Sequence, residues 1–160
     1  MSPQSTNQLA DKHLRLIGLI ATEWSMLETT IDFGLWGLLG IHQPAGRAVT
    51  SYIHATTRFD LLITLAEKQF SGGIVDNLKS LRTKFKDLLA QRNDYVHAQW
   101  KYIGGSPYFG YGKINKRGNL EAKKLQTSIS EFEQVVLDIQ SLNNDLNNVM
   151  ELNDFPFPDP

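Results

Sequence analysis

The chain has 160 residues, of which 41% are hydrophobic and 21% are charged, and its formal net charge is −1 at pH 7. This length suits one domain with a hydrophobic core, and the composition excludes disorder as the main state. The near-neutral charge excludes the global basic field of many nucleic-acid-binding domains, and the absence of cysteine excludes disulfides and thiolate chemistry. A local nucleic-acid site is still compatible with this near-neutral net charge.

The N-terminal region carries no pattern typical of secretion or of a membrane span. Residues 1–13 are polar and charged where a signal peptide needs an apolar segment. The apolar stretch that follows is interrupted by Glu23, Glu28 and Asp32, and a span of about 20 apolar residues would not normally carry three acids. We therefore expect a cytoplasmic protein that does not enter a membrane.

Hydrophobic periodicity predicts four main helices in chain order, over residues 7–39, 45–70, 75–98 and 128–152. In each range apolar residues recur at alternating spacings of three and four, which is the period of one helix face. Ser128 and Glu131 form a capping-box pattern at the start of the fourth helix. The inner faces of these helices are expected to bury Trp24, Phe59, Phe85 and Phe132.

The pattern changes between the third and fourth helices. Residues 100–120 are rich in glycine and aromatic residues, and a Gly-Gly-Ser-Pro sequence at 104–107 indicates a turn between two short extended runs. Three prolines exclude a helix in residues 153–160. The sequence thus predicts an all-α four-helix bundle with a short β-hairpin-like insertion, as a single domain over residues 7–152, followed by a Pro-rich C-terminal tail.

Three residues near the end of the third helix carry the candidate chemistry. Arg92 continues the apolar stripe that ends at Leu88, so a guanidinium falls where a core residue is expected. Asn93 and His97 are four residues apart and share a helix face, so the amide can orient the imidazole. A neutral imidazole can take a proton from a ribose 2′-hydroxyl while the guanidinium neutralises a phosphate. The simpler alternative is a structural arginine and a histidine that compensates the helix dipole.

An inward arginine requires a partner, because charged residues are seldom fully buried unless they are paired. Glu28 falls on the apolar stripe of the first helix, so an ion pair between Glu28 and Arg92 would join two helices of the bundle. In that arrangement Glu28 orients Arg92 from behind the site. A slight rotation of the first helix would instead leave Glu28 at a solvated edge, and the sequence does not choose between the two.

The run Arg92-Asn93-Asp94-Tyr95-Val96-His97 resembles the R-x4-6-H motif of the HEPN superfamily. The resemblance implies an all-α bundle and, for many members, metal-independent endoribonuclease activity in toxin–antitoxin, antiphage or RNA-processing systems. It implies that Arg92 contacts the scissile phosphate, that His97 acts as acid or base, and that Asn93 positions His97 or the RNA. It also implies a homodimer whose two motifs form one cleft. Where a toxin subgroup carries a tyrosine used for inactivation, this chain has Gln99.

The insertion supplies further candidates for RNA contact. Its aromatic and basic side chains can stack on bases and attract phosphates beside the motif, or can pack onto the bundle. The candidates are Lys101, Tyr108, Phe109, Tyr111 and Lys113. The other histidines, His13, His42 and His54, have no metal-ligand spacing, so we expect no metal site and no cofactor.

These patterns together favour a homodimeric, metal-independent endoribonuclease that cleaves RNA by attack of the 2′-hydroxyl. The expected partners are an RNA substrate, a second copy of the chain, and an antitoxin or another product of a neighbouring gene. Two alternatives stay open. One is a non-catalytic helical interaction module, and the other is a sensor whose pocket binds a nucleotide or another anion.

Overall fold

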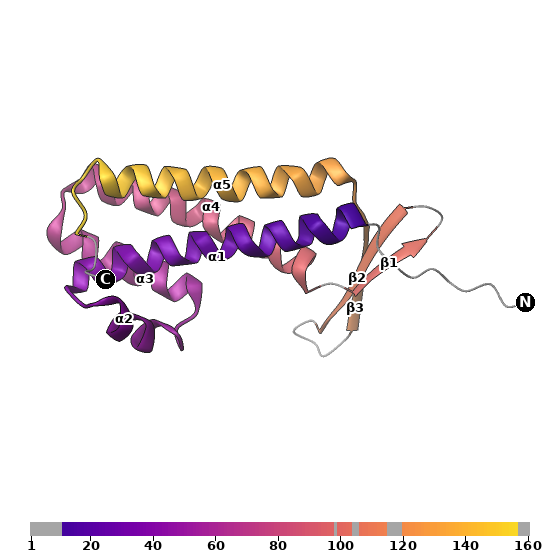
Figure 1. Ribbon diagram of the computed structural model, residues 1–160, viewed down its shortest axis with the longest axis horizontal. Helices are drawn as coiled ribbons and strands as arrows, with labels where there is room; N and C mark the ends of the chain where they lie inside the picture. Colours follow the sequence, from indigo (N-terminus) through magenta and orange to yellow (C-terminus); the bar gives the residue numbers. More distant parts are fainter. Residues whose placement is uncertain (1–10, 98, 104–105, 115–119, 157–160) are drawn as a thin grey trace, which may run out of the picture.

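The computed structural model describes residues 11–97, 99–103, 106–114 and 120–156, and for residue 99 and residues 101–126 it describes the backbone alone. In these residues the chain forms an all-α bundle with a small sheet at one end, so the predicted fold class is confirmed (Figure 1). The helices are α1 (Asp11–Leu39), α2 (Gln43–Thr50), α3 (Ala55–Gln69), α4 (Gly72–Val96) and α5 (Ile129–Glu151). The strands are β1 (Gln99–Ile103), β2 (Ser106–Ile114) and β3 (Leu120–Gln126).

The bundle core lies between four of the helices. Helix α1 packs against α3 and α5, and α4 packs against the same two helices and against α1. The expected core aromatics are all buried, with Trp24, Phe59, Phe85 and Phe132 each at most 2% exposed. Trp24 and Phe59 contact Phe85, with ring centroids 4.8 Å and 5.3 Å away. Burial of these rings removes a large apolar area from water, which is the main force that holds the helices together.

Within the described part of the chain, no helix is both long and apolar enough to cross a membrane.

The second predicted helix is divided in two, which corrects the expectation of one helix over residues 45–70. Helix α2 ends at Thr50 and α3 begins at Ala55, although residues 51–54 contain neither glycine nor proline. A Cβ on Gly46 would lie 2.4 Å from Trp36, so the backbone of α2 presses directly against that indole. Tyr52 lies between the two helices and is 92% exposed.

The insertion between α4 and α5 is larger than the expected two-stranded hairpin. Strands β1, β2 and β3 pair in that order, and both pairings are antiparallel. The additional strand is β3, where Leu120-Glu121-Ala122-Lys123 alternates apolar and polar residues, the period of a strand. In Figure 1 the sheet lies beyond the end of the long helices, next to the C-terminus of α4.

The beginning of the C-terminal tail belongs to the core. Asp154 has a φ of 51°, a left-handed conformation that turns the chain back after α5. The backbone N–H of Phe155 then donates to the carbonyl of Met150 at 3.0 Å, and its ring stacks on Phe70 with centroids 4.4 Å apart. The domain therefore extends past residue 152 to include Phe155, which is 3% exposed. Residues 157–160 lie outside the described residues.

Candidate functional site

Arg92, Asn93 and His97 meet at the C-terminus of α4. The Arg92 Nη1 donates to Asn93 Oδ1 at 3.0 Å and lies 2.8 Å from His97 Nε2. A guanidinium carries donors only, so His97 Nε2 must be the acceptor in this contact, and the neutral ring then holds its proton on Nδ1. Asn93 and His97 are exposed and Arg92 is half-buried. The three side chains therefore form one surface cluster in which a cation covers the basic nitrogen of an imidazole.

The link between Asn93 and His97 differs from the one expected. The sequence suggested that the amide holds the imidazole directly, whereas Arg92 bonds to both and stands between them. Asn93 and His97 are linked directly through the backbone instead. The N–H of His97 donates to the carbonyl of Asn93 at 3.1 Å and closes the last turn of α4. Asn93 thus orients the guanidinium, and the guanidinium orients the imidazole.

An aromatic cluster holds the chain on both sides of His97. The Trp100 Nε1 donates to the carbonyl of Tyr95 at 2.8 Å, and the two rings are stacked. Both rings also contact Phe132 of α5, with centroids 4.6 Å and 5.1 Å away. Sequence reasoning did not single out Tyr95 and Trp100 as positioning residues, although two aromatic residues flanking a candidate histidine are a usable signal.

Glu28 does not orient Arg92, which corrects the expected ion pair. Its Oε2 accepts from Arg58 Nη2 of α3 at 2.8 Å, while Asp32 Oδ2 accepts from Arg58 Nη1 at 2.6 Å. The Trp24 Nε1 donates to Oε1 of Glu28. The inner face of α1 passes through Leu27 instead, so Glu28 lies at the edge of that face, toward α3.

The cluster of Glu28, Asp32 and Arg58 is largely shielded from water. Its side chains are 30%, 14% and 11% exposed, respectively. Burial raises the pKa of Asp32 above its ordinary value, although the hydrogen bond and the charge of Arg58 act in the opposite direction. Glu28 and Asp32 are four residues apart on one helix, and this spacing was the signal that a cation from another helix would meet both.

Arg92, by contrast, keeps its charge uncompensated. Within the described ranges no carboxylate pairs with it, whereas Arg58 is paired with two. Its two partners are an amide oxygen and a neutral imidazole. An anion that approaches α4 at this point would therefore gain the full attraction of the guanidinium.

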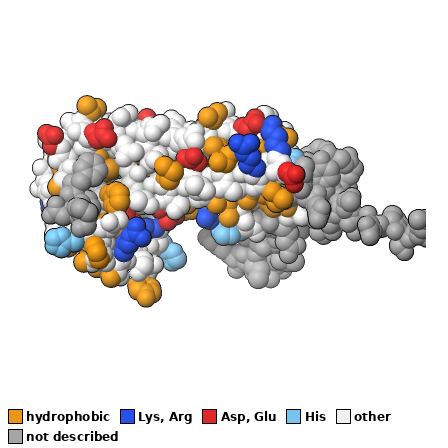
Figure 2. Space-filling model, in the orientation of Figure 1, with side chains coloured by type: hydrophobic (Ala, Val, Ile, Leu, Met, Phe, Trp, Pro, Cys, Tyr) orange, Lys and Arg blue, Asp and Glu red, His pale blue; other side chains and the backbone are white. Residues whose placement is uncertain are grey.

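The candidates in the insertion are placed by backbone only. Lys101 of β1 is paired with Tyr108 of β2, and Phe109, Tyr111 and Lys113 follow along β2. Their side chains lie outside the described part of the structure, so RNA contact by these residues stays a prediction. Figure 2 shows charges of both signs scattered over the described surface of this face. Because the net charge of the chain is −1, attraction of a polyanion must come from a local site.

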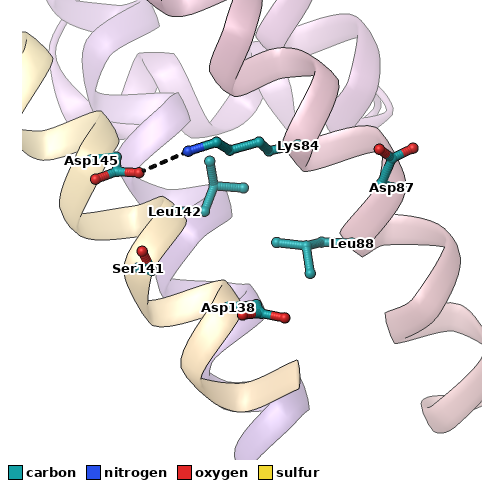
Figure 3. Close-up of a pocket in the computed structure, with 7 residues that line it drawn as sticks. All are labelled: Lys84, Asp87, Leu88, Asp138, Ser141, Leu142 and Asp145. Carbon is teal, nitrogen blue, oxygen red and sulfur yellow. Dashed lines mark hydrogen bonds and ion pairs between the residues drawn. The ribbon is translucent and has the colours of Figure 1, made fainter. Parts of the chain in front are cut away.

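A groove of about 310 Å³ between α4 and α5 is a poor candidate for RNA (Figure 3). Leu88 and Leu142 lie in it, and three carboxylates and one lysine surround them. Lys84 Nζ lies 3.3 Å from Asp145, which leaves Asp87 and Asp138 as uncompensated negative charges. These carboxylates repel phosphate, so this groove does not suit the RNA chemistry expected at Arg92.

Among the described side chains, no group of three histidine, aspartate or glutamate residues is placed to hold a metal ion. A comparison of the chain with protein-family models, with curated proteins and with solved structures found no match. The functional argument therefore depends on the geometry at Arg92 and His97.

Proposed function

We propose that this protein is a HEPN-like, metal-independent endoribonuclease whose site is built from Arg92, Asn93 and His97. The observation that carries the proposal is the 2.8 Å contact between Arg92 Nη1 and His97 Nε2, made by a guanidinium that no carboxylate neutralises in the described residues. A phosphate that draws Arg92 toward itself would release the lone pair of Nε2. Binding of the RNA phosphate would thus free His97 Nε2 to act as a general base next to that phosphate.

The reaction then proceeds in one displacement. The ribose 2′-oxygen attacks phosphorus and forms the O2′–P bond, while the proton of the 2′-hydroxyl passes to His97 Nε2. The P–O5′ bond breaks, and the leaving oxygen takes a proton from solvent water to become a 5′-hydroxyl, while the imidazolium of His97 gives its proton to the hydroxide left behind. Arg92 stabilises the charge that develops on the phosphoryl oxygens. The products are a 2′,3′-cyclic phosphate and a 5′-hydroxyl end.

The proposed assembly is a cytoplasmic homodimer that acts within a toxin–antitoxin or antiphage system. A second copy placed with its motif facing the first would supply a second Arg92 and a second imidazole. Two guanidiniums would concentrate positive charge in a chain whose net charge is only −1. A second imidazole would also provide the acid that protonates the leaving oxygen.

The chemistry is tested with purified protein, end-labelled RNA and a chelator. We expect cleavage that yields a cyclic phosphate, and no cleavage of DNA or of the same RNA with 2′-O-methyl groups, because both lack the attacking hydroxyl. His97→Ala and Arg92→Ala should each reduce the rate by about 10²–10⁴-fold. Asn93→Ala should reduce it less, because Asn93 acts through Arg92.

Matched controls separate the motif from general effects. His42→Ala and Arg82→Ala change a histidine and an arginine elsewhere on the chain and should leave the rate unchanged. Undiminished cleavage by His97→Ala would identify a contaminating nuclease. A folded protein that cuts no RNA would favour the non-catalytic interaction module.

The dimer is tested separately by light scattering and by mixing variants. If each cleft combines residues of two subunits, a mixture of His97→Ala and Arg92→Ala proteins should recover part of the lost rate. A monomer at micromolar concentration would contradict the shared cleft.

A further inference from the structure

The start of α3 lies level with the end of α4, where Arg92 is found. The two helices run antiparallel, and Phe59 of α3 contacts Phe85 of α4 with ring centroids 5.3 Å apart. Five residues before Phe59 is His54, which immediately precedes α3, and five residues after Phe85 is Ala90. Both segments cover about the same length along the bundle, so His54 lies level with Ala90, within one helix turn of Arg92. In Figure 1 the start of α3 and the end of α4 lie on the same side of α1.

The motif also lies on the side of α4 that faces α3. Arg82 marks this side, because it pairs with Asp60 of α3 at 2.8 Å. Asn93 follows eleven residues later, and one turn takes about 3.6 residues, so both side chains leave α4 in nearly the same direction. Packed helices lie about 8–10 Å apart, so residues 51–54, which lead into α3, are about one helix width from Asn93. An RNA strand that leaves the motif toward α3 therefore passes beside residues 51–54.

The distribution of charge favours this path over the opposite side of α4. Toward α5, Asp87 and Asp138 line the groove as uncompensated carboxylates that repel phosphate. Toward α3, the sequence has no acidic residue between Asp32 and Asp60, and Asp60 itself is paired with Arg82. A polyanion bound at the motif thus meets the least repulsion where it crosses the start of α3.

Two exposed side chains of this segment suit an RNA ligand. Tyr52 is 92% exposed, so its ring can receive a planar group without any change in the fold. Proteins commonly bind single-stranded nucleic acid by stacking bases on aromatic rings, because every base has a flat face. His54 is also exposed, and its side chain does not cap α3. An imidazole N–H of His54 can therefore donate to a phosphate oxygen.

We propose that residues 51–54 bind the nucleotide next to the scissile phosphate, with its base stacked on Tyr52 and its phosphate bonded to His54. This proposal rests on the proposed ribonuclease function, because the bound strand is the one that Arg92 and His97 cleave. Stacking requires a base that is not already paired and stacked in a duplex, and it accepts all four bases. The substrate is therefore a single-stranded region of RNA, with little base preference at this position.

The stacking contact is tested by fluorescence anisotropy with a single-stranded RNA that carries 2′-O-methyl groups throughout. This RNA cannot be cut, so its affinity is measured whether or not the protein is a nuclease. Tyr52→Ala should weaken binding about five- to thirtyfold, whereas Tyr52→Phe keeps the ring and should bind as the parent protein does. Leu152→Ala is the control, because this exposed apolar side chain follows α5 at the end away from the motif.

The phosphate contact is tested with His54→Ala in the same assay. The loss of one hydrogen bond should weaken binding roughly two- to twelvefold. His42→Ala is the matched control, because His42 is also exposed and precedes α2 at its opposite end. Equal affinities of the two variants would remove His54 from the proposed site.

Cleavage assays distinguish a failure of this proposal from a failure of the ribonuclease function. Tyr52→Ala should raise KM by about the factor lost in affinity and leave kcat nearly unchanged, because the stacked base takes no part in the reaction. Cleavage with unchanged KM and affinity in Tyr52→Ala would overturn the RNA contact and leave the ribonuclease standing. Binding that requires Tyr52, without any cleavage, would support the contact and contradict the ribonuclease.

Photocrosslinking tests where the strand lies. RNA with 4-thiouridine at one position at a time should cross-link to Tyr52 from a nucleotide adjacent to the cleavage site, and cross-links from distant positions alone would overturn the placement. Two other results would overturn the proposal itself. One is the absence of saturable binding of the methylated RNA at millimolar concentration. The other is conversion of a dimer to a monomer by Tyr52→Ala, which would assign Tyr52 to a contact between subunits.

Discussion

Arg58 and Arg92 lie on helices of the same bundle, but the side chains that bind them differ in charge. Arg58 makes a 2.8 Å ion pair with Glu28 and a 2.6 Å ion pair with Asp32, and its side chain is 11% exposed. Arg92 is bonded to an amide oxygen and to an imidazole nitrogen on the surface. The first guanidinium is neutralised inside the protein, and the second is available to a ligand.

The difference shows how an arginine used for structure can be told from one available for chemistry. A buried charge is tolerated only when opposite charges and hydrogen bonds replace its hydration, and Arg58 has both. Neutral partners fix the direction of a guanidinium without reducing its charge, and Arg92 has only such partners in the described residues. The charge of an arginine's partners therefore distinguishes the two roles better than the number of its hydrogen bonds.

The largest effect expected from this comparison is the loss of Arg58. Arg58→Ala leaves Glu28 and Asp32 without their cation, and breaking such a pair should lower the free energy of unfolding by about 3–5 kcal/mol, toward the lower end because Glu28 is partly exposed. Chemical denaturation measures the change. Lys84→Ala is the control, because Lys84 and its partner Asp145 are both exposed and the variant should lose less than about 1 kcal/mol. Equal losses would contradict the distinction.

The second-largest effect is expected at the close contact between Gly46 of α2 and Trp36 of α1. Gly46→Ala would put a Cβ 2.4 Å from Trp36, and the resulting overpacking should cost about 1–3 kcal/mol. Gly18→Ala is the matched control, because no atom lies within 4 Å of its added Cβ and alanine favours the helix by roughly 0.5–1 kcal/mol. Thermal unfolding should therefore shift in opposite directions for the two variants.

A pH series distinguishes a buried carboxylate from an exposed one. Burial raises the pKa of Asp32, so its contribution to stability is greatest below its unfolded value and is lost as pH rises through the folded value. The backbone N–H of Ser128, followed by side-chain hydrogen bonds, lowers the pKa of Glu131, so its contribution is present above the unfolded value and is lost as pH falls. We therefore measure the free energy of unfolding as a function of pH from pH 7 to acid. The Asp32→Asn and Glu131→Gln substitutions should change the slope of this curve in opposite directions. Parallel slopes would contradict this.

The smallest expected change in stability is that of Arg92→Ala. Its partners are exposed, so both can bond to water after the substitution, and the free energy of unfolding should change by less than about 0.5 kcal/mol. The same variant is expected to lose cleavage. A destabilisation comparable to that of Arg58→Ala would mean that Arg92 is a structural residue and would remove the contrast.

Several features followed from short-range patterns. The apolar periodicity identified the four long helical regions and the buried aromatics, because one helix face must be removed from water whatever it meets. The capping box formed as expected, with the N–H of Glu131 donating to the hydroxyl of Ser128. The spacing of Arg92 and His97 placed them within reach at one helix end, since five residues along a helix rise only about 7.5 Å and the arginine side chain is long.

The sequence by itself therefore determined the helical faces, the fold class and the local grouping of the candidate catalytic residues. The tertiary structure decided the division of the second helix, the pairing of Glu28 with Arg58 and the return of Phe155 to the core. The last two depend on contacts between residues distant in sequence, Glu28 with Arg58 and Phe155 with Phe70. Periodicity records which side of a helix is apolar, whereas the partner of a side chain depends on how neighbouring helices rotate and approach when they pack.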